Sequence, residues 1–274
     1  MRADQLLVAR GLAGTRSQAQ RLIASGVRWR LADGQAWRAV AKNGEELNEQ
    51  VELDVLDDAE QRYVSRGGLK LEGALDHLGS RIVDVAGRTC LDVGQSTGGF
   101  TDVLLRRGAL RVVGVDVGHG QLNASLKAHA QVVAIEGVNA RELSPALLGA
   151  AMPARGFDLL VCDVSFISVT KLVAAWPALL AEGGQVVSLV KPQFEAGPQH
   201  VGKGGIVRDD AVLATVERHV RAAFTEAGLQ VVDYFPSSIQ GGDGNREFFI
   251  HARRGARIEV LDDAPPLHLP SEQP

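Results

Sequence analysis

The sequence has 274 residues, 45% of them hydrophobic, and a formal net charge of −4 at neutral pH. This length allows one full domain and a smaller one, and the composition is that of a globular α/β protein rather than a fibrous or disordered chain. The negative charge excludes a global positive field, so any affinity for nucleic acid must come from a local basic patch.

The chain shows no sign of a disulfide framework, a metal site or a membrane segment. Its two cysteines, Cys90 and Cys162, lie singly in apolar runs, and its seven histidines have no metal-ligand spacing. The N-terminus lacks the apolar core of a signal peptide, and no run approaches the ~20 apolar residues of a membrane span. We therefore predict a cytoplasmic protein that neither crosses a membrane nor binds a metal.

The first thirty residues are basic, with six arginines against a single acid, Asp4. Apolar residues recur there at helical spacing on both sides of residues 11–15, which predicts a helical hairpin whose second helix begins near Ser17. Residues 27–40 then alternate as two strands about the Asp33-Gly34 turn. Residues 45–60 reverse the charge, with eight acids and no base. We interpret this acidic run as a solvated face leading to a domain boundary near residues 57–62.

From Thr89 onward, extended and helical segments alternate. The extended runs are residues 89–94, 111–118, 131–137, 157–166, 184–194, 231–239 and 246–254, and the helical runs are 100–108, 121–129, 167–181 and 209–228. Such alternation predicts an α/β, Rossmann-like, mostly parallel seven-stranded sheet with helices on both faces. We expect a small α+β domain over residues 1–60, this larger domain over 61–252, and a disordered tail over 253–274.

The stretch CLDVGQSTGGFTD, residues 90–102, predicts a ligand-binding loop. A strand that ends in glycines and opens a helix brings backbone N–H groups and a positive helix terminus to a ligand. The spacing is not G-x-G-x-x-G, so the dinucleotide fingerprint is not met. Asp116 ends the next extended run, about 20 residues on, where a carboxylate can hold ribose hydroxyls.

This loop resembles the first motif of S-adenosylmethionine-dependent methyltransferases, which implies that cofactor. The residues that the resemblance assigns to cofactor binding are Asp92, Gly94, Ser96, Thr97, Gly98, Gly99, Phe100, Asp116, Val117 and Asn139. Gln95 stands at a loop position that is usually small, and we expect it to alter cofactor affinity.

Four charged residues are predicted to meet at one edge of the sheet. Asp163 ends the stretch FDLLVCD, Lys191 ends VVSLVK, Glu247 lies at the start of REFFI, and Lys70 lies near a helix start. Ligands of such sheets bind beyond the carboxyl ends of the strands. Buried charges need partners, and a purely structural role hardly explains four charged residues at one edge of the sheet. This placement therefore favours a functional site.

Several motifs together resemble the TlyA family, proteins also labelled hemolysins. They are SRGGLKL, DVG-x-STGGFTD, CDVSFIS, LVKPQFE, VGKGGIVRD and GN-x-EFF, and the first sixty residues resemble an S4 RNA-binding domain. Members of this family methylate ribose 2′-hydroxyls of ribosomal RNA, here expected to be on cytidine, and share a catalytic tetrad with FtsJ-like enzymes. The resemblance implies a tetrad of Lys70, Asp163, Lys191 and Glu247. The residues expected to contact RNA are Arg2, Arg10, Arg16, Arg21, Arg66 and Lys203.

The proposed chemistry needs a base for the ribose proton. A lysine can accept that proton only in its neutral form, which neighbouring positive charges favour and carboxylates oppose. Lys191 is the predicted base, oriented by Asp163, while Lys70 and Glu247 shape the field and hold the ribose.

Two other functions stay open at this point: a membrane-active hemolysin, and an idle ribosome-binding or assembly factor. A segment around Lys203, GPQHVGKGG, fits a phosphate-binding loop except that Gly204 replaces the Ser or Thr that holds magnesium. We interpret it as a mobile loop that touches RNA rather than ATP.

Overall fold

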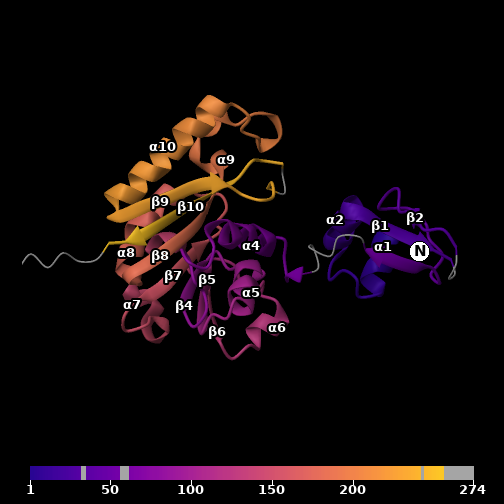
Figure 1. The fold of residues 1–274 in the computed structure, drawn as a ribbon, viewed down its shortest axis with the longest axis horizontal. Coiled ribbons are helices and arrows are strands. Elements are labelled where there is room, and N and C mark those ends of the chain that lie inside the picture. The colour runs from indigo at the N-terminus through magenta and orange to yellow at the C-terminus, as the bar shows by residue number, and fades with distance from the viewer. Residues whose placement is uncertain (32–34, 56–61, 242–243, 256–274) are drawn as a thin grey trace, which may run out of the picture.

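The structure is a computed structural model that describes residues 1–31, 35–55, 62–241 and 244–255. A small N-terminal unit lies beside a larger α/β unit (Figure 1). The elements of the N-terminal unit are α1 (Ala3–Ala9), α2 (Arg16–Gly26), β1 (Val27–Arg30), β2 (Arg38–Ala39) and β3 (Glu52–Val55). Its three strands form an antiparallel sheet in the order β2-β1-β3.

The larger unit is built on one seven-stranded sheet. Its strands are β4 (Thr89–Val93), β5 (Arg111–Asp116), β6 (Val132–Glu136), β7 (Phe157–Cys162), β8 (Leu180–Val190), β9 (Leu229–Pro236) and β10 (Phe248–Arg254). They lie in the order β6-β5-β4-β7-β8-β10-β9, with β10 antiparallel to both of its neighbours and the other pairs parallel. The predicted mostly parallel sheet is therefore confirmed, and the carboxyl ends of β4, β5, β7 and β8 meet at one edge.

Helices cover both faces of this sheet because its strands are apolar on both sides. Leu159 packs with α4 (Gly67–Leu78) and α5 (Gly99–Arg106), while the next residue, Leu160, packs with α10 (Asp210–Glu226) on the other face. Successive strand residues point to opposite faces, so one strand serves two cores. The remaining helices are short: α6 (Ala124–Lys127), α7 (Pro145–Leu148), α8 (Trp176–Leu179) and α9 (Pro192–Glu195).

The helix predicted over residues 167–181 is wrong. That segment forms two 3₁₀ turns, Val169–Lys171 and Val173–Ala175, and then the single turn α8. Pro177 cannot donate a backbone hydrogen bond and is tolerated only in the first turn of a helix, so a continuous helix cannot run through it. The helix predicted over residues 121–129 is shortened to the four residues of α6.

Some of the predicted features lie outside the residues that the structure describes. The Asp33-Gly34 turn and most of the boundary near residues 57–62 are not described, nor are residues 256–274 of the predicted tail. Arg253 and Arg254 belong to β10, where they pair with β9, so the larger unit extends two residues beyond the expected limit at 252. Within the described part of the chain, no helix has both the length and the apolar character to cross a bilayer.

The acidic run contributes more than a solvated face. Residues 52–55 form β3, which pairs along the whole of β1. Asp54 accepts a hydrogen bond from Arg28 at 2.7 Å, and Glu52 accepts one from Arg30 at 2.7 Å. Opposite charges on directly paired strands stabilise the pairing, so part of the acidic run neutralises the basic strand beside it.

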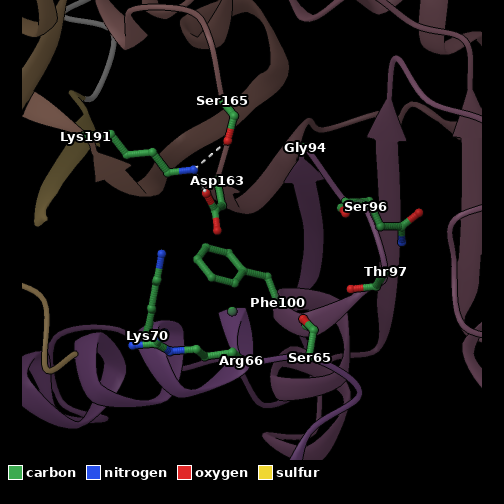
Figure 2. A pocket seen from close by; sticks show the side chains of 13 residues that line it. Ser65, Arg66, Lys70, Gly94, Ser96, Thr97, Phe100, Asp163, Ser165 and Lys191 are labelled. Atoms are coloured by element: carbon green, nitrogen blue, oxygen red, sulfur yellow. Dashed lines mark hydrogen bonds and ion pairs between the residues drawn. The ribbon is translucent and has the colours of Figure 1, made fainter. Parts of the chain in front are cut away.

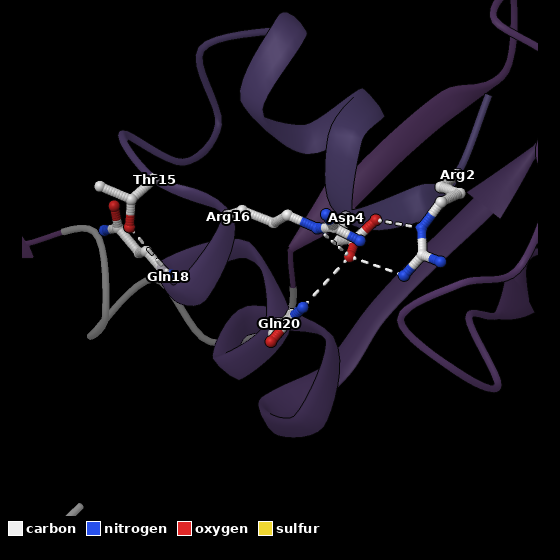
Figure 3. A network of polar contacts seen from close by, with 6 residues as sticks. All are labelled: Arg2, Asp4, Thr15, Arg16, Gln18 and Gln20. Atoms are coloured by element: carbon white, nitrogen blue, oxygen red, sulfur yellow. Dashed lines mark hydrogen bonds and ion pairs between the residues drawn. The ribbon is translucent and has the colours of Figure 1, made fainter.

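A buried carboxylate joins the two N-terminal helices (Figure 3). Asp4 is fully buried and accepts hydrogen bonds from Arg2 at 3.0 Å, from Arg16 at 2.8 Å and from Gln20 at 3.2 Å. These donors, the guanidinium of Arg2 first, hold the pKa of Asp4 far below its ordinary value. Arg2 and Arg16, both predicted as RNA contacts, therefore also have a structural role.

We predict that Asp4→Asn lowers the free energy of unfolding of the N-terminal unit by about 1.5–3 kcal/mol, the value of hydrogen bonds to a charged group. Because the folded pKa of Asp4 is depressed, its stabilisation is complete above the ordinary value of 3.8 and is lost as pH falls through the folded pKa. Urea unfolding followed by tryptophan fluorescence measures this, since Trp29 and Trp37 lie in this unit. Asp76→Asn, which removes an exposed pair with Arg107, is the control and should cost below about 1 kcal/mol. Equal losses of unfolding free energy in the two variants would contradict the prediction.

Candidate functional site

The four charged residues predicted at the sheet edge lie together as two ion pairs. Lys70 of α4 is 2.5 Å from Glu247, the residue before β10, and Lys191, directly after β8, is 2.5 Å from Asp163, directly after β7. Lys191 also donates a hydrogen bond to Ser165 at 2.9 Å (Figure 2). Lys70, Lys191 and Glu247 are buried. Lys70 and Glu247, which are 177 positions apart in the chain, share this site with Asp163 and Lys191 because β7 and β8 end at this edge, the antiparallel β10 begins there, and α4 lies beside it.

The glycine-rich loop joins β4 to α5 and is held in place by residues at the ends of the neighbouring strands. Gly94 has φ +85°, and a Cβ there would lie 2.4 Å from the backbone oxygen of Asp163, so this position requires glycine. Asp116, at the end of β5, accepts hydrogen bonds from the backbone N–H groups of Ser96 at 2.8 Å and Gly118 at 2.7 Å. A carboxylate has about four acceptor positions, so Asp116 can still bind hydroxyl groups.

Three adjoining cavities open at this edge, and Ser165 lines all of them. The first, of about 500 Å³, is lined by Asp116, Val117, Asn139, Gly94 and Ser96 among others. The second, of about 290 Å³, contains Lys70, Asp163 and Lys191 together with Thr97, Gly99 and Phe100. The third, of about 450 Å³, is lined by Lys70, Lys191 and Glu247. The charged residues thus stand between a cavity beside the loop and one farther along the edge.

Two predicted cofactor residues line none of these cavities. Asp92 is fully buried beneath the loop, where it accepts a hydrogen bond from Thr101 at 2.7 Å, and burial raises its pKa to about 7. Gly98 has φ +96° and packs against Leu126, so it shapes the start of α5. Both residues support the loop from inside rather than facing a ligand.

Gln95, expected to alter cofactor affinity, points its amide towards the sheet. It is buried and donates a hydrogen bond to Thr101 at 2.9 Å, which continues the chain of contacts to Asp92. The amide lies over Gly114 of β5, where a Cβ would come within 2.0 Å of Gln95 Cδ. A large residue is tolerated in this loop because the strand beneath it carries glycine.

The residues predicted to bind RNA are spread over several surfaces. Arg66 lines the cavity of the ion pairs and donates a hydrogen bond to the backbone oxygen of Gln240 at 2.9 Å. Lys203 lines a separate cavity beside α10. Arg10 donates a hydrogen bond to the backbone oxygen of Glu49, and Arg21, like Arg2 and Arg16, belongs to the N-terminal unit.

Ser165 and Phe166 also line the site, and no sequence pattern predicted them. Phe166 is 91% exposed and has a φ of +64°, and the centroid of its ring lies 5.4 Å from that of Phe194. A positive φ is costly for a bulky residue, and such strain often marks a functional position. An apolar residue at the end of an apolar run gives no sequence signal that it faces solvent.

Among the described residues, no group of three or more His, Cys, Asp or Glu side chains is arranged to hold a metal ion. The cavities instead offer carboxylates, ammonium groups, hydroxyl groups and aliphatic walls. This set of groups suits a charged or polar organic ligand with an apolar ring.

The chain is similar in sequence and in fold to several known proteins. Residues 63–254 match the FtsJ-like methyltransferase family. The chain is 41% identical to the 16S/23S rRNA (cytidine-2′-O)-methyltransferase TlyA of Mycobacterium tuberculosis, over 96% of this chain and 95% of that protein. It is 35% identical to Hemolysin A of Brachyspira hyodysenteriae, over 92% and 99%. A solved structure of a candidate hemolysin from Streptococcus thermophilus superposes with a TM-score of 0.70 at 38% identity, over 95% and 92%.

We predict that Gly114→Ala destabilises the protein and that Gln95→Ala offsets this. The added Cβ would overlap the buried amide of Gln95, and overpacking of a core costs about 1–3 kcal/mol. Urea unfolding of both single variants and the double variant gives the coupling energy, which we expect to exceed about 0.5 kcal/mol in the compensating direction. Additive effects would show that the two positions are not in contact.

Proposed function

Because this chain belongs to the FtsJ-like methyltransferase family and, within it, to the TlyA proteins, we propose that it transfers a methyl group from S-adenosylmethionine to a ribose 2′-hydroxyl of ribosomal RNA. The observation that carries the proposal is the pair of lysine–carboxylate contacts between two cavities at the sheet edge. By analogy with the Mycobacterium tuberculosis relative, whose name specifies cytidine, the target nucleotide is a cytidine. A ribosomal RNA substrate would place the protein in the cytoplasm.

The cofactor would occupy the 500 Å³ cavity beside the glycine-rich loop. S-adenosylmethionine supplies a methyl group on a positively charged sulfur. The carboxylate of Asp116 would hold the ribose hydroxyls, and the exposed Val117 next to it would cover one face of the adenine. Gly94, Ser96 and Thr97 would hold the methionine end, which directs the methyl group towards Asp163 and Lys191.

The two ion pairs would position and deprotonate the ribose hydroxyl. Methyl transfer is an in-line displacement, so the oxygen must be held opposite the sulfur and must lose its proton. Lys191, in its neutral form, would accept that proton at Nζ while Asp163 and Ser165 fix the direction of its side chain. Lys70 and Glu247 would hold the ribose from the opposite side of the cavity.

Phe166 would support the base of the target nucleotide. Its exposed ring borders both the cofactor cavity and the 450 Å³ cavity. Unstacked RNA bases bind to proteins by stacking on aromatic rings. An aromatic side chain placed beside the charged residues is therefore suited to a nucleoside that has left its stack.

We further propose that residues 1–60 form an S4-like RNA-binding domain. Arginines on its helices or directly after them, above all Arg10 and Arg21, would contact phosphates and supply affinity for the ribosomal subunit. Arg2 and Arg16 would do so with the sides of their guanidinium groups that Asp4 leaves exposed.

We predict that Asp116→Ala weakens cofactor binding by about 1.5–3 kcal/mol, which is about 10- to 160-fold in Kd, because it removes hydrogen bonds to a charged group. Isothermal titration of S-adenosylmethionine into the purified protein measures this. Asp84→Ala, which removes an exposed carboxylate at the opposite end of the sheet, should leave the affinity unchanged. Wild-type affinity in the Asp116 variant would contradict the cofactor assignment.

We predict that Lys191→Ala and Lys191→Arg both bind cofactor but lose about 10²–10⁴-fold in the rate of methyl transfer, the range for loss of a general base. Arginine stays protonated and cannot accept the hydroxyl proton. Single-turnover transfer of a labelled methyl group to ribosomal subunits measures the rate, and Lys171→Arg, an exposed lysine in a 3₁₀ turn, is the control. If Lys191→Arg keeps a near-normal rate, Lys191 supplies only charge. If the wild-type protein transfers no methyl group to RNA, the proposed function fails.

A further inference from the structure

We propose that a fourth cavity, beside the third one described above, binds phosphate groups of the RNA strand next to the target nucleotide. This cavity, of about 470 Å³, is lined by His200, Gly202, Lys203, Ile206, Arg208 and Asp209. The proposal rests on the proposed function, since it concerns the path of the same substrate beyond the modified ribose.

One loop separates this phosphate cavity from the catalytic residues. Val201 and Gly205 line the cavity that contains Lys70, Lys191 and Glu247, while Gly202 and Lys203 line the phosphate cavity. The loop connects α9 to α10 (Figure 1). A strand with its target ribose against the lysines would therefore cross this loop and enter the phosphate cavity.

The positive charges of the cavity are available to a ligand. Lys203 and Arg208 are exposed and form no ion pair with any residue that the structure describes. The neighbouring Arg246 differs, because its guanidinium lies 2.5 Å from the carboxylate of Asp210. Asp209 is the one acid in the lining, and its carboxylate accepts a hydrogen bond from the N–H of Ala211 at the start of α10. Two unpaired cations and one engaged carboxylate give a net positive site.

The loop is held in a defined shape by a fully buried amide. Asn245 accepts a hydrogen bond from the N–H of Val207 at 2.9 Å and donates one to the oxygen of Gly205 at 2.9 Å. The N–H of Gly202 also donates to the oxygen of Ile206 at 3.0 Å, which closes the turn that carries Lys203. The cations are thus presented on a preorganised turn, which lowers the entropic cost of binding. Because Asn245 lies two residues before Glu247, the same segment positions the turn and the tetrad.

A nucleoside triphosphate fits this cavity less well than an RNA backbone. The segment GPQHVGKGG lacks the Ser or Thr that would hold magnesium, and the start of α10 is capped by Asp209 instead of being free for a phosphate. Each phosphodiester of an RNA backbone carries a single negative charge, so Lys203 and Arg208 suffice to bind two of them without magnesium.

The test compares full-length wild type with Lys203→Ala/Arg208→Ala in binding a fluorescently labelled, single-stranded oligocytidine RNA by anisotropy from 0.05 to 1 M potassium chloride. Each phosphate contact to a single strand contributes about 0.7 to the slope of log K against log salt. We expect the slope to fall by about 1.4, so that binding is about 25-fold weaker at 0.1 M salt and converges with wild type near 1 M. Cofactor affinity should not change.

The matched control is Arg81→Ala/Arg155→Ala, which removes two exposed arginines near the opposite edge of the sheet and should keep the wild-type slope. A wild-type slope in the Lys203/Arg208 variant would overturn the proposal, as would magnesium-dependent ATP binding that this variant loses. If the wild type methylates ribosomal RNA but the slope does not change, only this inference fails. If the wild type does not methylate RNA, the proposed function fails as well.

Discussion

Two ion pairs lie at the edge of the sheet, Lys70 with Glu247 and Lys191 with Asp163, each with a nitrogen–oxygen distance of 2.5 Å. None of the four side chains is more than 20% exposed. Removing an ion from water costs several kcal/mol even in real proteins, and an opposite charge at contact distance offsets that cost only when the geometry is good. Each lysine therefore depends on its carboxylate, and loss of one member leaves its partner as a buried, uncompensated charge. The sheet makes this arrangement possible, because the carboxyl ends of parallel strands converge and α4 brings Lys70 to the same edge.

Much of the site was predictable because strand ends are readable in a sequence. Asp163 and Lys191 each follow an apolar run, and a mostly parallel sheet places such residues together whatever their distance along the chain. Features that depend on tertiary contacts were not predictable. The segment 167–181 has the apolar content of a helix, yet Pro177 and the packing of short turns against the core divide it. Nothing in the sequence separates the exposed Phe166 from the partly buried Val164 and Ile167 near it, or shows that Gln95 points towards Gly114.

The N-terminal unit shows how a charge count can mislead. Six arginines and one acid in thirty residues indicate a strongly basic surface. In the structure, Asp4 binds two of them, and Asp54 and Glu52 of the acidic run bind Arg28 and Arg30 across the sheet. Charges far apart in the sequence become neighbours through strand pairing. The positive charge that the unit can offer to a ligand is therefore smaller than the count of its arginines suggests. The RNA path proposed for the larger unit rests instead on Lys203 and Arg208, which have no acidic partner among the described residues.

The central claim is that these ion pairs serve methylation of a ribose in ribosomal RNA. The most direct test is to map 2′-O-methylation across the ribosomal RNA of cells with the gene, without it, and with it restored. The account predicts at least one cytidine whose methylation disappears with the gene and returns with the wild-type copy. Identical maps in all three strains would contradict it and would leave a ribosome-binding role without chemistry.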